Sequence, residues 1–157
     1  RFWNQSPLKA TKIITQPHPG FKTDWQPVWT TLMTQSKGQS EVIEAVHNNR
    51  FGFVTDLQQM GAKIELFNPI PKDPDKFYNF NLGDDRPEYF HAASIGGPTR
   101  LKPIQTTVRD IRNGATLVLA ALMAKGRTII DNVDMIDRGY ENFDVRLKRL
   151  GADITQS

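Results

Sequence analysis

The chain has 157 residues, of which 38% are hydrophobic and 24% are charged, and this composition is typical of a folded domain rather than of a disordered or fibrous chain. No apolar run is long enough to span a membrane. The absence of cysteine excludes disulfides and thiolate metal sites. The net charge of +3 permits an anionic partner, but the basic residues are scattered among acidic ones, so no nucleic acid is expected.

The three histidines, His18, His47 and His91, do not have the spacing of metal ligands. We therefore expect no metal site, and nothing in the sequence indicates a cofactor. The chain begins at Arg1 without a methionine or a signal-peptide pattern, and we expect it to be a fragment of a longer protein.

Residues 11–15 predict a short strand, and the prolines and glycine at 17–20 predict a loop after it. A helix is then expected from Thr23 or Asp24, either of which could cap it, to Gly38. The apolar face of this helix, which we expect to be buried, comprises Trp25, Val28, Trp29, Leu32 and Met33.

Residues 41–46 are rich in β-branched side chains and predict a second strand. Arg50 lies at the expected start of a shorter helix, in which Phe53, Leu57 and Met60 form the buried face and Gly61 the C-cap. Residues 63–67 alternate as a half-buried strand.

Residues 68–104 are rich in proline, aspartate, asparagine and aromatic residues. We interpret them as an elaborated hairpin or surface excursion, with a partly disordered loop as the alternative. Gly96-Gly97-Pro98 reads as a turn, because no strand and helix frame it as they would a phosphate loop.

The second half of the chain predicts a helix over 110–125 that is apolar almost all round and therefore buried on every side. A strand over 128–130, a helix over 139–150 and a strand over 152–155 follow. The buried face of the last helix is expected to comprise Tyr140, Phe143, Leu147 and Leu150.

Short sequence patterns recur at a nearly constant spacing: Gly61-Ala62 matches Gly151-Ala152, and Asp24 matches Asp110. We therefore expect an α/β (α+β) fold with an internal duplication. Residues 11–67 form repeat one and residues 105–157 form repeat two, and 68–104 are inserted between them. Each repeat reads roughly as β-α-β-α-β.

Asp24 and Asp110 lie at expected helix starts, where an aspartate is ordinarily a cap. Arg50 and Arg138 are predicted at helix N-termini, which is the unfavourable end of the helix dipole for a cation. An anion bound there would explain them, and an ion-paired surface arginine is the alternative.

Arg112 follows Asp110 by two residues, so both side chains are expected near one helix start. Arginines match phosphate and carboxylate oxygens, and an ionised aspartate can take a proton from a hydroxyl. The expected substrate therefore carries an anionic group and a hydroxyl to activate.

Four segments carry a resemblance to a known family: Pro-Gly-Phe-Lys-Thr-Asp-Trp-Gln at 19–26, Asn-Arg-Phe at 49–51, Asp-Ile-Arg at 110–112 and Ile-Asp-Arg-Gly-Tyr-Glu at 136–141. In order and spacing they resemble the C-terminal part of the UDP-N-acetylglucosamine enolpyruvyl transferases (1-carboxyvinyltransferases). The match covers residues 17–67 and 105–154. The Asp-Arg-Gly-Tyr-Glu stretch resembles these enzymes rather than the 5-enolpyruvylshikimate-3-phosphate synthases.

The resemblance implies transfer of enolpyruvyl from phosphoenolpyruvate to the 3-hydroxyl of UDP-N-acetylglucosamine, the first committed step of peptidoglycan synthesis, in the cytoplasm. It also implies an inside-out α/β barrel of βαβαββ-type repeats, two of which are present here. By position, Asp24 is implied as the base on the sugar hydroxyl and Val46 as a neighbour of the nucleotide sugar. Arg50, Arg112 and Arg138 would surround the enolpyruvyl and phosphate groups, and Asp110 would stabilise charge in the tetrahedral intermediate.

Some features depart from the family. Its Lys-Asn pair and its loop cysteine (aspartate in some members) belong to an N-terminal half that is absent here, so this chain alone is expected to be inactive. Asn113-Gly114 replaces a small Ala-Ser type pair, which should loosen that helix start. The insertion at 68–104 is longer than the family hairpin. The alternatives are a silent scaffold on the same repeat, a shikimate-type synthase and a nucleic-acid-binding module.

Overall fold

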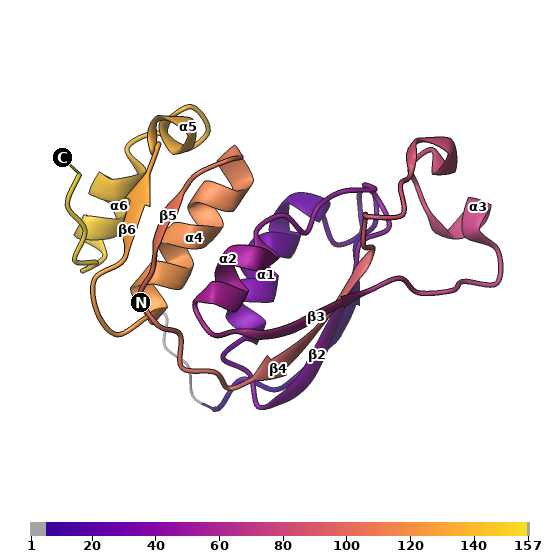
Figure 1. The fold of residues 1–157 in the computed structure, drawn as a ribbon, viewed down its shortest axis with the longest axis horizontal. Coiled ribbons are helices and arrows are strands. Elements are labelled where there is room, and N and C mark those ends of the chain that lie inside the picture. Colours follow the sequence, from indigo (N-terminus) through magenta and orange to yellow (C-terminus); the bar gives the residue numbers. More distant parts are fainter. Residues whose placement is uncertain (1–5, 157) are drawn as a thin grey trace.

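The computed structural model describes residues 6–156 as an elongated α/β structure with two separate sheets (Figure 1). The strands are β1 (Lys12–Ile14), β2 (Gly38–Ile43), β3 (Lys63–Phe67), β4 (Ala92–Gly97), β5 (Gln105–Thr107) and β6 (Ile129–Asp131). The α-helices are α1 (Gln26–Met33), α2 (Val54–Gln59), α3 (Pro74–Phe77), α4 (Ile111–Met123), α5 (Asp134–Asp137) and α6 (Phe143–Arg149). Two short 3-10 helices are η1 (Thr23–Trp25) and η2 (Leu82–Asp84).

The larger sheet has the order β1-β2-β4-β3, and the smaller pairs β5 with β6. Strands β1 and β2 run parallel and are joined through α1, and β5 and β6 run parallel and are joined through α4. Helices α1 and α4 pack against each other, which brings the two β-α-β units together (Figure 1).

Strand β4 is one of the elements that the sequence pattern did not predict. Its residues, Ala-Ala-Ser-Ile-Gly-Gly, have little β-propensity, yet the strand lies between β2 and β3 and pairs antiparallel with both. The expectation that Gly96-Gly97 forms a turn is wrong, because both residues belong to β4. A Cβ at Gly97 would lie 2.3 Å from the Ser36 carbonyl oxygen, so the close approach of the chain after α1 requires glycine there.

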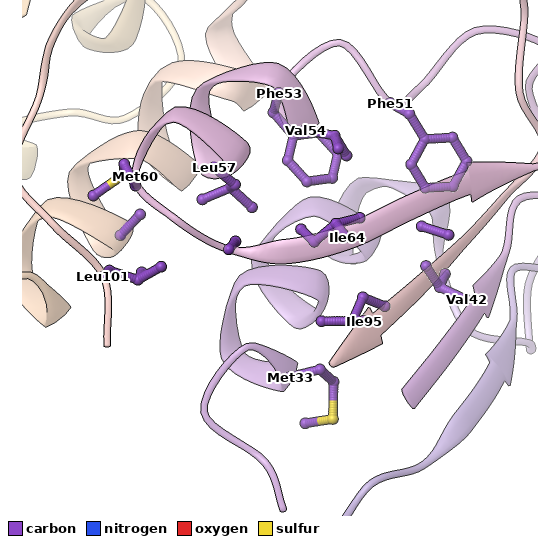
Figure 2. Close-up of a cluster of buried hydrophobic side chains, with 13 residues drawn as sticks. Met33, Val42, Phe51, Phe53, Val54, Leu57, Met60, Ile64, Ile95 and Leu101 are labelled. Carbon is purple, nitrogen blue, oxygen red and sulfur yellow. The ribbon is translucent and has the colours of Figure 1, made fainter. Parts of the chain in front are cut away.

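The hydrophobic core lies between α2 and the larger sheet (Figure 2). Phe53, Leu57 and Met60 are completely buried, as the helical spacing predicted. They pack towards Ile64 of β3 and Ile95 of β4 (Figure 2). Burying side chains of this size contributes about 1.5–3 kcal/mol each, so this face fixes α2 on the sheet.

The face that α1 buries differs from the expected one. Trp25, Val28 and Leu32 are 54%, 40% and 43% exposed, so the predicted burial of this stripe is wrong for them. The helix instead buries a polar face containing Thr30 and Thr31. Thr31 can be buried because its hydroxyl donates a hydrogen bond of 3.0 Å to the Pro27 carbonyl.

Helix α4 is amphipathic rather than buried on every side. Ala115, Leu117 and Ala120 are buried, whereas Leu122 is 40% exposed. Gly114 lies in the buried face, where a Cβ would lie 2.6 Å from Cγ1 of Ile136 and 2.9 Å from Cγ1 of Val108. The glycine therefore allows α5 to approach α4, which gives Gly114 a packing role beyond the loosening expected from helix propensity.

The C-terminal segment also differs from its prediction. Of the helix expected over 139–150, only Phe143–Arg149 is helical, as α6, and residues 139–142, which follow α5, are not helical. Residues 152–155 form no strand. Asn142 adopts a left-handed conformation with φ of 49°, which separates the two helices. Leu150, expected on the buried face, is 84% exposed.

Residues 68–91 connect the antiparallel strands β3 and β4 and project from the end of the molecule opposite α5 and α6 (Figure 1). We call this segment the excursion. It contains α3 and η2, and its small core is made by the rings of Tyr78, Phe80 and His91, with centroids 4.9–5.1 Å apart. The excursion is therefore a folded hairpin connection that packs on itself.

Candidate functional site

Two aspartates and two arginines from three separate parts of the sequence meet at the starts of α1 and α4. Asp24 Oδ1 lies 3.7 Å from Nη1 of Arg50 and 3.6 Å from Nη1 of Arg112. Asp110 Oδ2 lies 3.2 Å from Nη2 of Arg112. The structure thus brings together four of the six predicted site residues, which we call the acid–arginine cluster.

Asp24 lies in η1, immediately before α1, and its side chain does not cap a helix. The N-cap residue of α1 is Trp25, with no side-chain hydrogen bond. The expectation of a capping role is therefore wrong for Asp24, because its carboxylate is turned towards the two arginines instead. The side chain is 64% exposed, so the carboxylate remains accessible to a ligand.

Asp110, in contrast, is both a cap and a partner of Arg112. Its Oδ1 accepts a 2.8 Å hydrogen bond from the Arg112 backbone N–H at the start of α4, so the predicted cap is confirmed. Burial opposes ionisation of this carboxyl, but hydrogen bonds and charge from Arg112 outweigh burial and lower its pKa. The Arg112 pKa is raised, chiefly by the hydrogen bond to Asp110. The pair is thus charged on both sides.

Arg50 is the most enclosed member of the cluster. Its side chain is 11% exposed, and burial followed by the neighbouring Arg112 charge lowers its pKa. Its Nη1 atom is buried and has no hydrogen-bond acceptor among residues 6–156. A buried guanidinium donor without an acceptor is unfavourable, and an anionic oxygen would satisfy it.

Arg50 does not begin a helix, contrary to the prediction, because α2 starts four residues later at Val54. It lies at the end of the loop that follows β2. Its position relative to a helix dipole is therefore no reason to expect an anion there, whereas its buried guanidinium, which lacks an acceptor at Nη1, is such a reason.

The loop after β2 is held by Glu44, a residue that sequence reasoning did not single out. Glu44 is completely buried, and its Oε1 accepts hydrogen bonds from the Thr15 hydroxyl at 2.8 Å, the Val46 N–H at 2.9 Å and the His47 N–H at 3.1 Å. Its Oε2 accepts a 2.8 Å bond from the Thr23 hydroxyl. One carboxylate therefore fixes both the Val46 backbone and the residue before Asp24.

A sequence signal for Glu44 existed, since it is an acid within the otherwise apolar stretch from Val42 to Val46. Buried carboxylates in such a stretch require several donors, and here they organise a loop. Val46 is half-buried at the centre of that loop.

His47, next to Val46, has its pKa lowered by partial burial and then by the charge of Arg50. The imidazole is therefore neutral near pH 7. Its protonation would add a positive charge close to two arginines, which couples the cluster to pH.

Arg138 stands apart from the cluster. It is the C-cap residue of α5, not the start of a helix as predicted, and its exposed side chain makes no ion pair with another described residue. The next residue, Gly139, lies close to Ile111, since a Cβ there would be 2.6 Å from Cγ2 of Ile111. The chain therefore passes the start of α4 at Gly139, but the Arg138 side chain forms no ion pair with the acid–arginine cluster.

Within residues 6–156 no group of three or more His, Asp or Glu side chains is arranged to hold a metal ion. None of the helices described is long and apolar enough to cross a bilayer. The acid–arginine cluster places carboxylates beside guanidinium groups at two helix starts, and guanidinium groups and helix N-termini both attract anions.

These features define an α/β protein in which aspartates and arginines meet at the starts of α1 and α4. The chain belongs to the EPSP synthase (3-phosphoshikimate 1-carboxyvinyltransferase) family, whose sequence model matches residues 3–147.

Individual relatives are similar along nearly the whole chain. The UDP-N-acetylglucosamine 1-carboxyvinyltransferase of Chlamydia abortus is 39% identical over 155 residues, covering 98% of this chain and 34% of the relative. The protein of the same name from Vibrio atlanticus is 37% identical and covers 95% of this chain and 30% of the relative. The chain thus spans about a third of the length of these curated relatives.

A solved structure has the same fold. The enolpyruvyl transferase NikO from Streptomyces tendae superposes with a TM-score of 0.75 at 27% identity, covering 97% of this chain and 30% of that one. The mixed α/β architecture is therefore that of an enolpyruvyl transferase.

Proposed function

We propose that this chain is part of a longer enzyme that transfers enolpyruvyl from phosphoenolpyruvate to the 3-hydroxyl of UDP-N-acetylglucosamine. This is the first committed step of peptidoglycan synthesis, and it places the enzyme in the cytoplasm and in cell wall biogenesis, cell shape and cell division. The relatives named UDP-N-acetylglucosamine 1-carboxyvinyltransferase support the proposal. The observation that carries it is the approach of Asp24 to Arg50 and Arg112.

The site residues fit an addition followed by an elimination. Asp24, exposed beside the arginines, takes the proton from the sugar 3-hydroxyl. The hydroxyl oxygen adds to the enol carbon of phosphoenolpyruvate, and the methylene carbon of phosphoenolpyruvate gains a proton. Arg50 and Arg112 hold the phosphate and carboxylate, and Asp110 stabilises charge in the tetrahedral intermediate. Loss of phosphate and of a proton from the methyl carbon then restores the double bond. Val46 lies beside the nucleotide sugar.

We assign Arg138 to the same anionic groups, although it makes no contact with the cluster among the described residues. An exposed arginine on the segment after α5 can turn towards a bound anion without breaking an existing ion pair. The turnover of an Arg138 variant therefore tests this assignment.

We further propose that residues 11–67 and 105–157 are two repeats of an inside-out α/β barrel domain. The parallel strand pairs joined by α1 and α4 support this, as does the packing of these helices. The exposed Trp25, Val28 and Leu32 would pack against a further repeat supplied by an N-terminal part. The fragment alone is then inactive and tends to self-associate.

The experiment is to assay phosphate release by the longer protein with both substrates, and to compare Asp24→Ala and Arg138→Ala with the wild type. Loss of turnover in both variants, with unchanged folding, supports the proposal. A wild-type protein without phosphate release favours a silent scaffold, whereas turnover unaffected by Arg138→Ala removes Arg138 from the site.

The acceptor is tested in the same assay. The family model is named for 3-phosphoshikimate transfer, so shikimate 3-phosphate is the second candidate acceptor. Turnover with shikimate 3-phosphate but not with UDP-N-acetylglucosamine would replace the proposed acceptor.

A further inference from the structure

We propose that Asn79, in the excursion, is a positioning residue that holds the loop of residues 44–47 in the shape that receives the nucleotide sugar. The inference rests on the proposed function, since that function assigns Val46 to the substrate. The excursion then acts on the site from outside the acid–arginine cluster.

Asn79 makes two hydrogen bonds to the loop of residues 44–47. Its backbone N–H donates to the Ala45 carbonyl oxygen at 2.7 Å, and its side-chain Nδ2 donates to the same oxygen at 3.2 Å. Ala45 is completely buried and directly precedes Val46. The Ala45 carbonyl oxygen, directly before Val46, therefore accepts two hydrogen bonds from Asn79.

A second contact joins the excursion to the same loop region. Asn48 Nδ2 donates a 2.8 Å hydrogen bond to the Asp84 carbonyl oxygen in η2. At the base of the excursion, the Glu44 N–H donates to the His91 carbonyl at 2.7 Å. The excursion thus bonds to Glu44, Ala45 and Asn48, on both sides of Val46.

The excursion is built to keep Asn79 in place. Asn79 lies between Tyr78, which is 9% exposed, and Phe80, and both rings pack on His91. His91 Nε2 lies 3.2 Å from Oδ1 of Asp85, and the His91 N–H donates to Asn68 Oδ1 at 2.8 Å. These contacts fix both flanks of Asn79, so its two donors are preorganised.

The opposite side of the loop is held by Glu44, which binds the Val46 and His47 N–H groups. Glu44 and Asn79 therefore hold the loop through different atoms, the amides and the Ala45 carbonyl respectively. Removal of the Asn79 side chain should loosen the loop without disturbing Arg50 or Asp24, because neither contacts the excursion in the bonds described.

The first test measures the loop directly, by hydrogen exchange of the Val46 and His47 amides in the longer protein. Asn79→Ala should raise their exchange about five-fold, the effect of losing one ordinary hydrogen bond. Asn79→Asp keeps the size of the side chain but replaces the Nδ2 donor with an oxygen that faces the Ala45 carbonyl, so it should raise the exchange at least as much as Asn79→Ala. Asp73→Ala, which removes the cap of α3 at the far end of the excursion, is the matched control and should leave these amides unchanged.

The second test measures kinetics in the longer enzyme. Asn79→Ala should raise KM for UDP-N-acetylglucosamine about five-fold, with KM for phosphoenolpyruvate and kcat nearly unchanged. A wild-type protein without enolpyruvyl transfer overturns the proposed function, while the exchange experiment still decides whether Asn79 holds the loop. Exchange and KM that match the wild type in both Asn79 variants overturn the positioning role.

Discussion

Arg50 and Asp24 form an ion pair in which the arginine is enclosed and the aspartate is exposed. The two side chains are 11% and 64% accessible, and their closest charged atoms lie 3.7 Å apart. Exposed pairs at this distance contribute little to stability. The Asp24 carboxylate is therefore exposed to solvent, whereas the buried Nη1 of Arg50 has no hydrogen-bond acceptor among residues 6–156.

Asp24→Asn should separate catalysis from stability in the longer enzyme. The free energy of unfolding should change by less than about 0.5 kcal/mol, because the side chain is exposed and caps no helix. Loss of a general base should lower kcat about 10²–10⁴-fold. Glu65→Gln, an exposed acid on β3, is the control and should keep full turnover. Turnover by Asp24→Asn equal to the wild type would exclude Asp24 as the base.

Arg50→Met should abolish anion binding at little cost in stability. The variant removes a partly desolvated charge that lies near Arg112, and the Asp24 left behind is exposed and still pairs with Arg112. We expect the free energy of unfolding to change by less than about 1 kcal/mol. Thermal melts at rising phosphate concentration check the binding: the wild-type melting temperature should rise and that of Arg50→Met should not. Arg127→Met, outside the cluster, should respond like the wild type.

His47 predicts a dependence of stability on pH. Its folded pKa is lowered by partial burial and by Arg50, so the unfolded chain takes up the proton first as pH falls. The stabilisation is complete above the unfolded pKa of about 6.5 and is lost as pH falls through the folded value. Denaturant unfolding across this range should show the loss in the wild type and a flatter profile in His47→Gln. An equally steep profile in the variant would contradict the assignment.

The elements that the sequence predicted well are those in which local pattern and burial agree. Lys63–Phe67 alternates in sequence and forms β3 over the same residues, and the spacing of Phe53, Leu57 and Met60 gave the buried face of α2. In both cases one side of the element faces the core and the other faces solvent, so residue type reports burial.

The predictions of secondary structure and burial fail where contacts between residues distant in sequence determine the structure. Strand β4 lies in the middle of a sheet although its residues are small, because small residues suit the close approach of α1 and the chain after it. The helical period over 139–150 gave no sign that Asn142 adopts a left-handed conformation before α6. It also gave no sign that Arg138 follows the end of α5 instead of starting a helix. Thr31 on the polar face of α1 is buried with its hydroxyl bonded to the Pro27 carbonyl, a bond that a hydrophobicity pattern does not contain.

The candidate site was predictable only in part, for the same reason. The offset of two residues between Asp110 and Arg112 made their contact foreseeable from sequence. The approach of Asp24 to Arg50 joins residues on either side of α1 and β2, and no local pattern reports it. Glu44 was overlooked because its role is to satisfy amides that only the folded loop brings together.

Gly114→Ala should destabilise the fold even though alanine is the better helix former. The gain in helix propensity is up to about 1 kcal/mol, whereas forcing a methyl group into a filled space typically costs 1–3 kcal/mol. The new Cβ would lie 2.6 Å from Cγ1 of Ile136, so we expect the free energy of unfolding to fall by about 1–2 kcal/mol. Gly52→Ala is the control, because its nearest neighbour, Nδ2 of Asn113, is 3.4 Å away, and it should change stability little. If the overlap with Ile136 is the cause, Gly114→Ala should cost less in an Ile136→Ala background, and an unchanged cost would rule that contact out.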